Sequence, residues 1–291
     1  MTAPVLSFSF IILWSSAFIS AKAIMADGTA FASLALRFAI VAGGFGCAAL
    51  IIHWRTRPSR FLTLSETCHA AIAGCLLHGF YLGGVFWALS HGMQATLAAL
   101  IISLQPVFTA LLAGPLLGER ITARNWLGIL LGFMGALLVI GFDIGGAIPV
   151  PALLICCGAL LAAITGTLYQ KQFGQDMPLI PMNMVQAGAA MILHLILLAL
   201  FEVPSITLTT SYIVGMAWQI GAVSFGAYVM FMILLSRGSS QQTSSLLFLI
   251  APVAAVQGWI ILGETLTMQD MIGLGIASAG VYLATRRLAP S

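Results

Sequence analysis

The sequence predicts an all-α integral membrane protein whose ten transmembrane helices form two inverted five-helix repeats around a central cavity. Three observations support this prediction. The 291 residues are 60% hydrophobic and only 7% charged, with a mean hydropathy of +1.08, whereas soluble domains contain about 25% charged residues. Apolar stretches of membrane-spanning length follow one another closely, and one sequence motif occurs twice.

Apolar stretches can be placed along the whole chain. A helix crosses the bilayer core with about 20 apolar residues. The longest linker between stretches, residues 54–67, is also the most charged, and no room is left for a soluble domain. The predicted spans are residues 4–24, 30–53, 68–90, 94–117, 124–142, 150–171, 179–201, 211–235, 241–262 and 268–286.

The doubled motif divides the chain into two related halves. The first copy, residues 90–122, reads Ser-His-Gly, then Pro106, then Gly-Glu-x-x-Thr. The second copy, residues 236–267, reads Ser-Arg-Gly, then Pro252, then Gly-Glu-x-x-Thr. In both copies the proline follows the glycine of the opening triplet by fourteen residues. The predicted repeats are residues 1–143 and 149–291.

The distribution of lysine and arginine predicts the orientation. Cytoplasmic loops of membrane proteins are enriched in these residues. With the N-terminus inside, Lys22 is the one basic residue expected outside. The basic residues expected inside are Arg55, Arg57, Arg60, Arg120, Arg124, Lys171, Arg237, Arg286 and Arg287. We therefore expect a multi-pass protein of the plasma (bacterial inner) membrane with both termini in the cytoplasm. Five spans per half then invert the second repeat relative to the first, as in many secondary transporters.

Several of these residues resemble a known family. The segment Trp14-Ser15-Ser16-Ala17-Phe18, the Leu36-Arg37-Phe38 of the second span and the doubled Pro…Gly-Glu-x-x-Thr are similar to the drug/metabolite transporter superfamily, in its ten-span EamA branch. The resemblance implies a basket of helices around a central cavity, with spans five and ten apart as a scaffold. It also implies export of small metabolites, often amino acids and occasionally drug-like compounds.

Polar and aromatic residues inside the spans are the candidates for a substrate site. Arg37 is the most costly, because an arginine at mid-bilayer costs roughly 2.5–3.5 kcal/mol on insertion scales. It either extends to the interface or faces a water-filled cavity and binds an anionic group such as a carboxylate. The candidate cavity residues are Trp14, Ser16, Arg37, His78, Tyr81, Gln105, Asn183, Gln186, Trp218 and Tyr228.

Each candidate has a structural alternative. His78 lines the cavity, couples transport to protons or simply packs. Asn183 and Gln186 share one helical face with His194, and such a polar stripe must meet protein or water. The aromatic stripe from Trp218 to Tyr228 forms either packed core or a cavity wall. For Ser16, close helix packing is the default expectation.

Prolines and glycines predict bends and close contacts. Pro106 and Pro252 fall within the fourth and ninth spans, where each removes a helical hydrogen bond and favours a kink or hinge. Small-residue tracks occur on the fifth span at Gly128, Gly132 and Gly135, and on the tenth at Gly273, Ala277 and Gly280. Such tracks form packing or dimer faces, so a homodimer through helix ten is one expectation.

The sequence also argues against several function classes. No Asp or Glu lies in the interior of a predicted span, away from its ends, which disfavours proton exchange for cationic drugs. The sequence has no phosphate-binding loop, no metal-type cysteine spacing and no hydrolase motif, so we expect no cofactor, no metal and no enzyme activity. The low net charge of +3 predicts no nucleic-acid partner. We expect alternating-access export of a small-molecule substrate; the alternatives are efflux of drug-like compounds and a membrane scaffold.

Overall fold

The computed structural model describes residues 3–55, 61–93, 98, 101–102, 104–118, 121–140, 149–262 and 267–285. The described residues are overwhelmingly helical, which confirms the all-α prediction. In the first half the helices are α1 (Ala3–Asp27), α2 (Ala30–Arg55), α3 (Leu64–Gly74), η1 (Cys75–Phe80), α4 (Tyr81–Ser90), α6 (Gln105–Leu117) and α7 (Ala123–Ile140). In the second half they are α8 (Val150–Phe173), α9 (Leu179–Phe201), α10 (Thr210–Trp218), η2 (Gln219–Ala227), α11 (Tyr228–Arg237), α12 (Ser240–Ser245), η3 (Leu246–Leu249), α13 (Ile250–Leu262) and α14 (Met268–Thr285).

Local sequence signals set several helix ends. Thr63 and Glu66 form a capping box, in which each side chain accepts a hydrogen bond from the other residue's backbone N–H. The box starts α3 four residues before the predicted start of the third span. Gly118 ends α6 with a positive φ of 68°, a conformation that glycine adopts at little cost. Other parts of the doubled motif, including Glu119, Gly263 and Glu264, lie outside the described residues, as does Asp143 near the predicted boundary between the halves.

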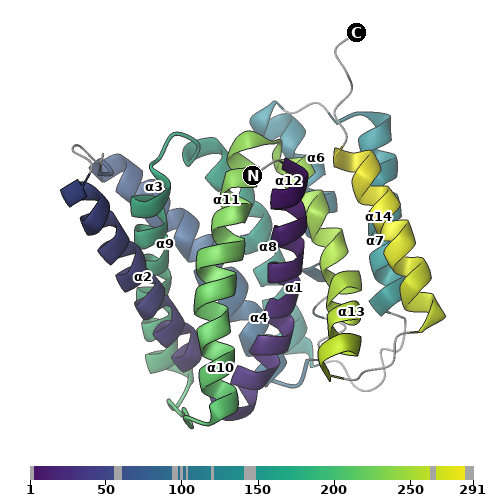
Figure 1. Cartoon of the computed structure of the whole chain (residues 1–291). Helices are drawn as coiled ribbons and strands as arrows, with labels where there is room; N and C mark the ends of the chain where they lie inside the picture. Colours follow the sequence, from purple (N-terminus) through teal and green to yellow (C-terminus); the bar gives the residue numbers. More distant parts are fainter. Residues whose placement is uncertain are drawn as a thin grey trace.

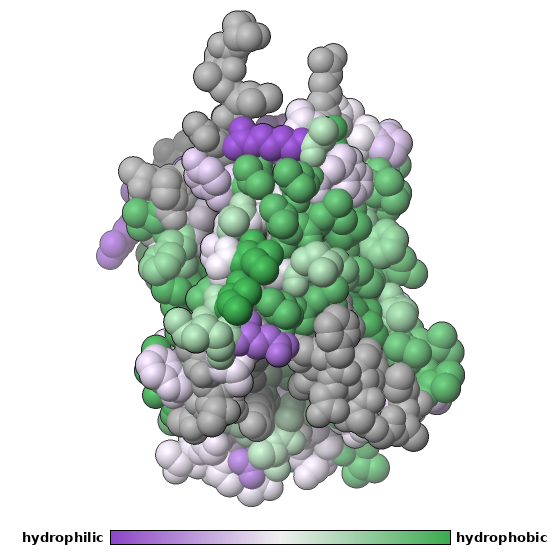
Figure 2. All heavy atoms as spheres, turned by 90° about the vertical axis from the view of Figure 1, so that its right-hand side faces the viewer, coloured by the Kyte–Doolittle hydropathy of each residue, from purple (hydrophilic) through white to green (hydrophobic). Residues whose placement is uncertain are grey.

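The helices have the length and composition of membrane spans. Within the described residues, seven helical runs are long and apolar enough to cross a bilayer. Three shorter apolar helices lie at Gln105–Leu117, Ala123–Leu138 and Met271–Ala284. Figure 2 shows that hydrophobic residues dominate the middle of the face formed by α7 and α14. Leu127, Leu130 and Met271 contribute exposed side chains to this face, as expected for a surface that contacts lipid.

Helices of the two halves of the sequence pack against each other, and each half makes matching contacts with the other (Figure 1). Helix α1 packs against α10, α11 and α13, whereas α8 packs against α3, α4 and α6. Helix α2 packs against α9, and α7 packs against α14. Figure 1 also shows that α1 begins and α14 ends at the same end of the bundle.

The pair α7 and α14 stands at one side of the bundle (Figure 1) and is held by glycines. A Cβ atom added to Gly128 would lie 2.5 Å from the backbone nitrogen of Ala284, and one added to Gly135 would meet the backbone of Ala277. The small-residue tracks thus face each other within the chain. A homodimer through α14 stays a prediction, and it would have to use another face of that helix.

Two spans contain a π-helical segment. In the third span η1 follows α3, and in the eighth span η2 follows α10. A π segment contains more residues per turn than an α-helix, so it rotates every later side chain around the helix axis. The two segments place His78 and Ser224 inside the bundle.

Candidate functional site

Arg37 lies two turns into α2 and points into the bundle rather than toward the lipid interface. Only 6% of the residue is exposed. Its Nε donates a hydrogen bond to the Ser224 hydroxyl on η2, with an N–O distance of 3.0 Å. Its guanidinium carbon lies 5.3 Å from the centre of the Phe38 ring. The chain therefore places a cation in a polar and aromatic interior.

Aromatic rings surround the buried His78 on η1. The centre of its imidazole ring lies 4.9 Å from that of Phe38 and 4.1 Å from that of Tyr228. The backbone carbonyl of His78 is 3.1 Å from Nε2 of His194 on α9. A carbonyl only accepts hydrogen bonds, so this contact assigns the proton of His194 to Nε2. His194 therefore joins α9 to η1.

A chain of uncharged hydrogen bonds continues from Tyr228. Its hydroxyl donates to Oε1 of Gln186 at 2.7 Å, and Nε2 of Gln186 donates to Oε1 of Gln170 at 2.6 Å. Nε2 of Gln170 in turn lies 3.2 Å from the sulfur of Met182. These residues come from α11, α9 and α8, so the chain crosses the centre of the bundle.

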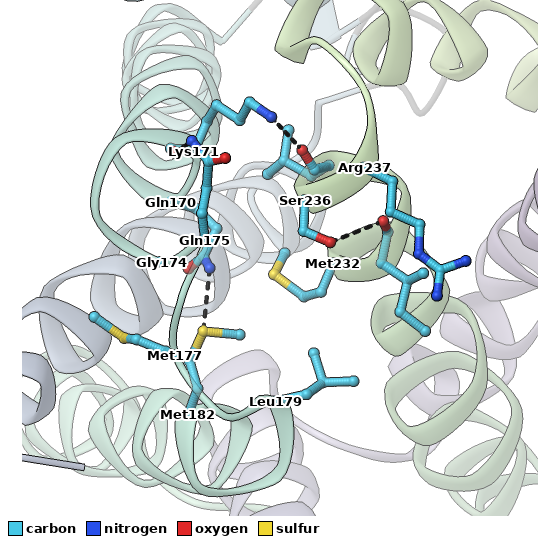
Figure 3. Close-up of a pocket in the computed structure, with 12 residues that line it drawn as sticks. Gln170, Lys171, Gly174, Gln175, Met177, Leu179, Met182, Met232, Ser236 and Arg237 are labelled. Atoms are coloured by element: carbon cyan, nitrogen blue, oxygen red, sulfur yellow. Dashed lines mark hydrogen bonds between the residues drawn. The ribbon is translucent and has the colours of Figure 1, made fainter.

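A cavity of about 150 Å³ lies at one end of the bundle, between the end of α8, the start of α9 and the end of α11 (Figure 3). Gln170 and Met182 belong to its wall, so the hydrogen-bond chain begins there. Lys171 and Arg237 also line it. The Lys171 ammonium donates to the carbonyl oxygens of Leu235 and Gly238, at 2.8 and 2.6 Å, and so caps the C-terminal end of α11.

At the opposite end of the bundle, hydrogen bonds join two loops to each other. The backbone N–H of Thr29 donates to the carbonyl of Ser205 at 2.9 Å, and that of Thr207 donates to Asp27 at 2.7 Å. The Thr209 hydroxyl donates to the Asp27 carboxylate at 2.6 Å. These ties join the α1–α2 loop to the α9–α10 loop. Because α9 is 23 residues long, roughly 34 Å separate them from the cavity.

The candidates on α1 and α10 lie in a separate contact. Trp218 is 46% exposed, and its indole N–H donates to the Ser16 hydroxyl at 2.8 Å. The Trp14 ring packs 5.2 Å from Phe10 and 5.7 Å from Phe231, measured between ring centres. Ser16 and Trp218 thus join α1 to α10, whereas Trp14 packs with the adjacent aromatic core.

The remaining candidates lie on other contacts. Nε2 of Gln105 donates to the Thr167 hydroxyl on α8 at 3.2 Å. Pro106 is the second residue of α6, and Pro252 is the third residue of α13, after the 3₁₀ turn η3. Both prolines therefore stand where a helix starts again, so the spans are interrupted there rather than smoothly kinked. Tyr81 begins α4 and is half-buried.

The structure thus brings Arg37, His78, Gln186 and Tyr228 into one cluster, with Asn183 one turn away on α9. Asn183 bonds its own helix at the Leu179 carbonyl. The sequence reasoning missed two members, Ser224 and Gln170. A stripe with an α-helical period follows Trp218, Gly221, Phe225 and Tyr228. The π segment η2 breaks that period and turns Ser224 inward. Gln170 lies near the end of α8, and it belongs to no stripe of polar residues that would indicate its role.

Comparison with known proteins identifies the family. The EamA-like transporter family matches residues 1–141 and again residues 150–286. The chain belongs to this family. The superfamily resemblance and the prediction of a membrane transporter are thereby confirmed.

Proteins similar to this chain include named exporters. A probable amino-acid metabolite efflux pump of Salmonella typhimurium is 25% identical over 68% of this chain and 70% of its own length. A probable terminal-alkyne amino-acid exporter of Streptantibioticus cattleyicolor is 27% identical over 95% of this chain and 91% of its own length. A solved crystal structure superposes with a TM-score of 0.78 at 20% identity, covering 97% of this chain and 96% of the other. It shows that the fold exists among solved proteins. The family and these relatives indicate a transporter rather than an enzyme.

Proposed function

We propose that the protein is a secondary transporter that exports small metabolites, with amino acids as the first class of substrate, by alternating access through the centre of the bundle. The names of the exporters of Salmonella and Streptantibioticus support the substrate class. The observation on which the proposal depends most is the polar cluster in the apolar bundle. Buried polar side chains are costly in a membrane and mark substrate paths.

The polar cluster lies between the cavity at one end of the bundle and the hydrogen-bonded loops at the other. The cavity reaches Gln170, and the hydrogen bonds through Gln186 and Tyr228 continue toward His78 and Arg37. Beyond Arg37 the two loops are tied together. This arrangement suits a transporter that receives its substrate at the cavity and releases it once the opposite ties open.

Two inverted five-helix repeats, residues 1–143 and 149–291, form the proposed moving parts. The reciprocal packing supports them: exchanging the two halves turns the contacts of α1 into those of α8 and leaves the α2–α9 and α7–α14 pairs unchanged. The π segments η1 and η2 occupy corresponding spans, and the family matches twice. The interruptions at Pro106 and Pro252 are the proposed hinges.

The proposed location is the cell membrane, with both termini in the cytoplasm. Lys171 and Arg237 line the cavity, and α1 begins and α14 ends at one end of the bundle (Figure 1). Positive charges concentrate on the cytoplasmic side of membrane proteins. The cavity is therefore assigned to the cytoplasmic end, as export requires.

Counterflow in proteoliposomes tests the proposal. Vesicles loaded with unlabelled amino acid should accumulate the labelled form, with and without a pH gradient. Gln186→Leu removes the two hydrogen bonds that the Gln186 side chain makes, to Tyr228 and to Gln170. We expect this variant to reduce flux about tenfold. Gly188→Ala is the control on the same helix, because no atom lies within 4 Å of the added Cβ. Flux equal to empty vesicles for every amino acid would reject the substrate class. Equal loss in both variants would reject the central path.

A further inference from the structure

The central cation has no carboxylate to balance it among the described residues. The contacts found for Arg37 are the neutral Ser224 hydroxyl and the Phe38 ring. The acidic residues that the structure describes lie at helix ends or in loops: Asp27, Glu66, Asp176, Glu202 and Asp270. A guanidinium has five N–H donors in a planar fork that fits a carboxylate. A buried charge without a counter-charge is strongly unfavourable, so the site is suited to receive an anion.

The cavity at the other end of the path is also lined by positively charged side chains. Lys171 and Arg237 line it, and none of the described residues that line it is acidic. Clefts lined by charge of one sign raise the local concentration of oppositely charged solutes. A solute that moved from the cavity to Arg37 would therefore meet cationic side chains at both ends of that route.

We propose that the substrate is carried as an organic anion, with its carboxylate held by Arg37 and its body against the Phe38, His78 and Tyr228 rings. This inference rests on the proposed export function and narrows its substrate class. The ammonium of a free amino acid would sit beside its own carboxylate, close to the Arg37 guanidinium, where like charges repel in a medium of low dielectric constant. Acylation of the amine removes that charge. N-acylated amino acids and related apolar monocarboxylates are therefore better substrates than the zwitterions.

A matched pair of solutes tests this charge selection in proteoliposomes. We expect N-acetyl-L-leucine to be transported at least about tenfold faster than L-leucine at equal low concentration. An inside-negative potassium diffusion potential should accelerate its efflux and leave that of L-leucine unchanged, because one negative charge leaves the vesicle. Arg37→Gln should abolish the preference. Arg37→Lys keeps the charge and should retain part of it, which separates loss of charge from loss of folding.

The control is Arg55→Gln, which removes an exposed arginine from the other end of the same helix. It should leave the ratio of the two rates unchanged. L-Leucine transported as fast as N-acetyl-L-leucine would overturn the anion proposal and leave the export function standing. N-acetyl-L-leucine efflux that ignores the potential would also overturn it, because the anion would then be moving with a proton. If neither solute exceeds empty vesicles while another amino acid does, the anion proposal fails alone. If no amino acid or derivative is transported, both proposals fail.

Discussion

The α7–α14 contact yields a sharp prediction about stability. Gly280 lies where α14 meets α7, and a Cβ at this position would contact the backbone nitrogen of Gly132 and lie 2.7 Å from the carbonyl oxygen of Gly128. Ordinary contacts of a Cβ begin at 3.4 Å. Gly280→Ala therefore forces the two backbones apart by about 0.7 Å or more, because no flexible side chain can move aside.

This separation loosens packing along both helices. Overpacking of this kind costs about 1–3 kcal/mol, which corresponds to a fall in melting temperature of about 2–5 °C for a chain of this size. The assay is thermal unfolding of purified protein in detergent, followed by tryptophan fluorescence.

Gly275→Ala is the matched control on α14, since an added Cβ there meets no atom within 4 Å. Alanine is the better helix former by about 0.5–1 kcal/mol, so this variant should melt at the wild-type temperature or slightly above it. A Gly280→Ala protein that melts within 1 °C of wild type, or a Gly275→Ala protein that is destabilised as much, would show that the glycines do not set this contact.

Two further predictions concern the central hydrogen-bond chain and the bonds between the α1–α2 and α9–α10 loops. Tyr228→Phe removes the donor to Gln186 and leaves a buried oxygen without its partner, so we expect a loss of about 1–3 kcal/mol in melting experiments together with slower flux; wild-type values for both would show that the bond is unimportant. Asp27→Ala removes the acceptor of the Thr209 hydroxyl, so the loop ties should open more often. In a cysteine-free background, a reporter cysteine at the buried Leu34 should then react faster with an impermeant maleimide added outside; an unchanged rate would count against a gate at this end.

The sequence was sufficient for the parts of the fold that depend on hydrophobic length. Apolar stretches of about 20 residues must become helices in lipid, because each backbone group needs an internal partner. The start of the third span was placed four residues late, since the capping box at Thr63 and Glu66 depends on local polar residues rather than on hydropathy. For the fourth span the sequence predicts a bend at Pro106, and in the structure the helix α6 begins at Gln105, next to this proline.

The site was partly predictable for a similar physical reason. Arg37, His78 and Gln186 were found because polar groups inside an apolar span need a partner wherever they point. Which residues become partners depends on packing between helices that are far apart in sequence. Trp218 and Tyr228, for example, belong to one predicted aromatic stripe, yet Trp218 bonds Ser16 on α1 and Tyr228 bonds Gln186 on α9.

The π segments explain why a periodic pattern failed at this point. Helical faces are assigned at 100° per residue, and that rule holds along α9, where Asn183, Gln186 and His194 are all buried. Across η2 the rule no longer applies, so residues on either side of the segment face different neighbours. The same interruption occurs in the third span at η1, which contains His78. Both irregular segments therefore contribute a polar residue to the cluster around Arg37. A regular α-helix through either span would turn His78 or Ser224 away from its present partners, so the local departure from α-helical geometry is what assembles the candidate site.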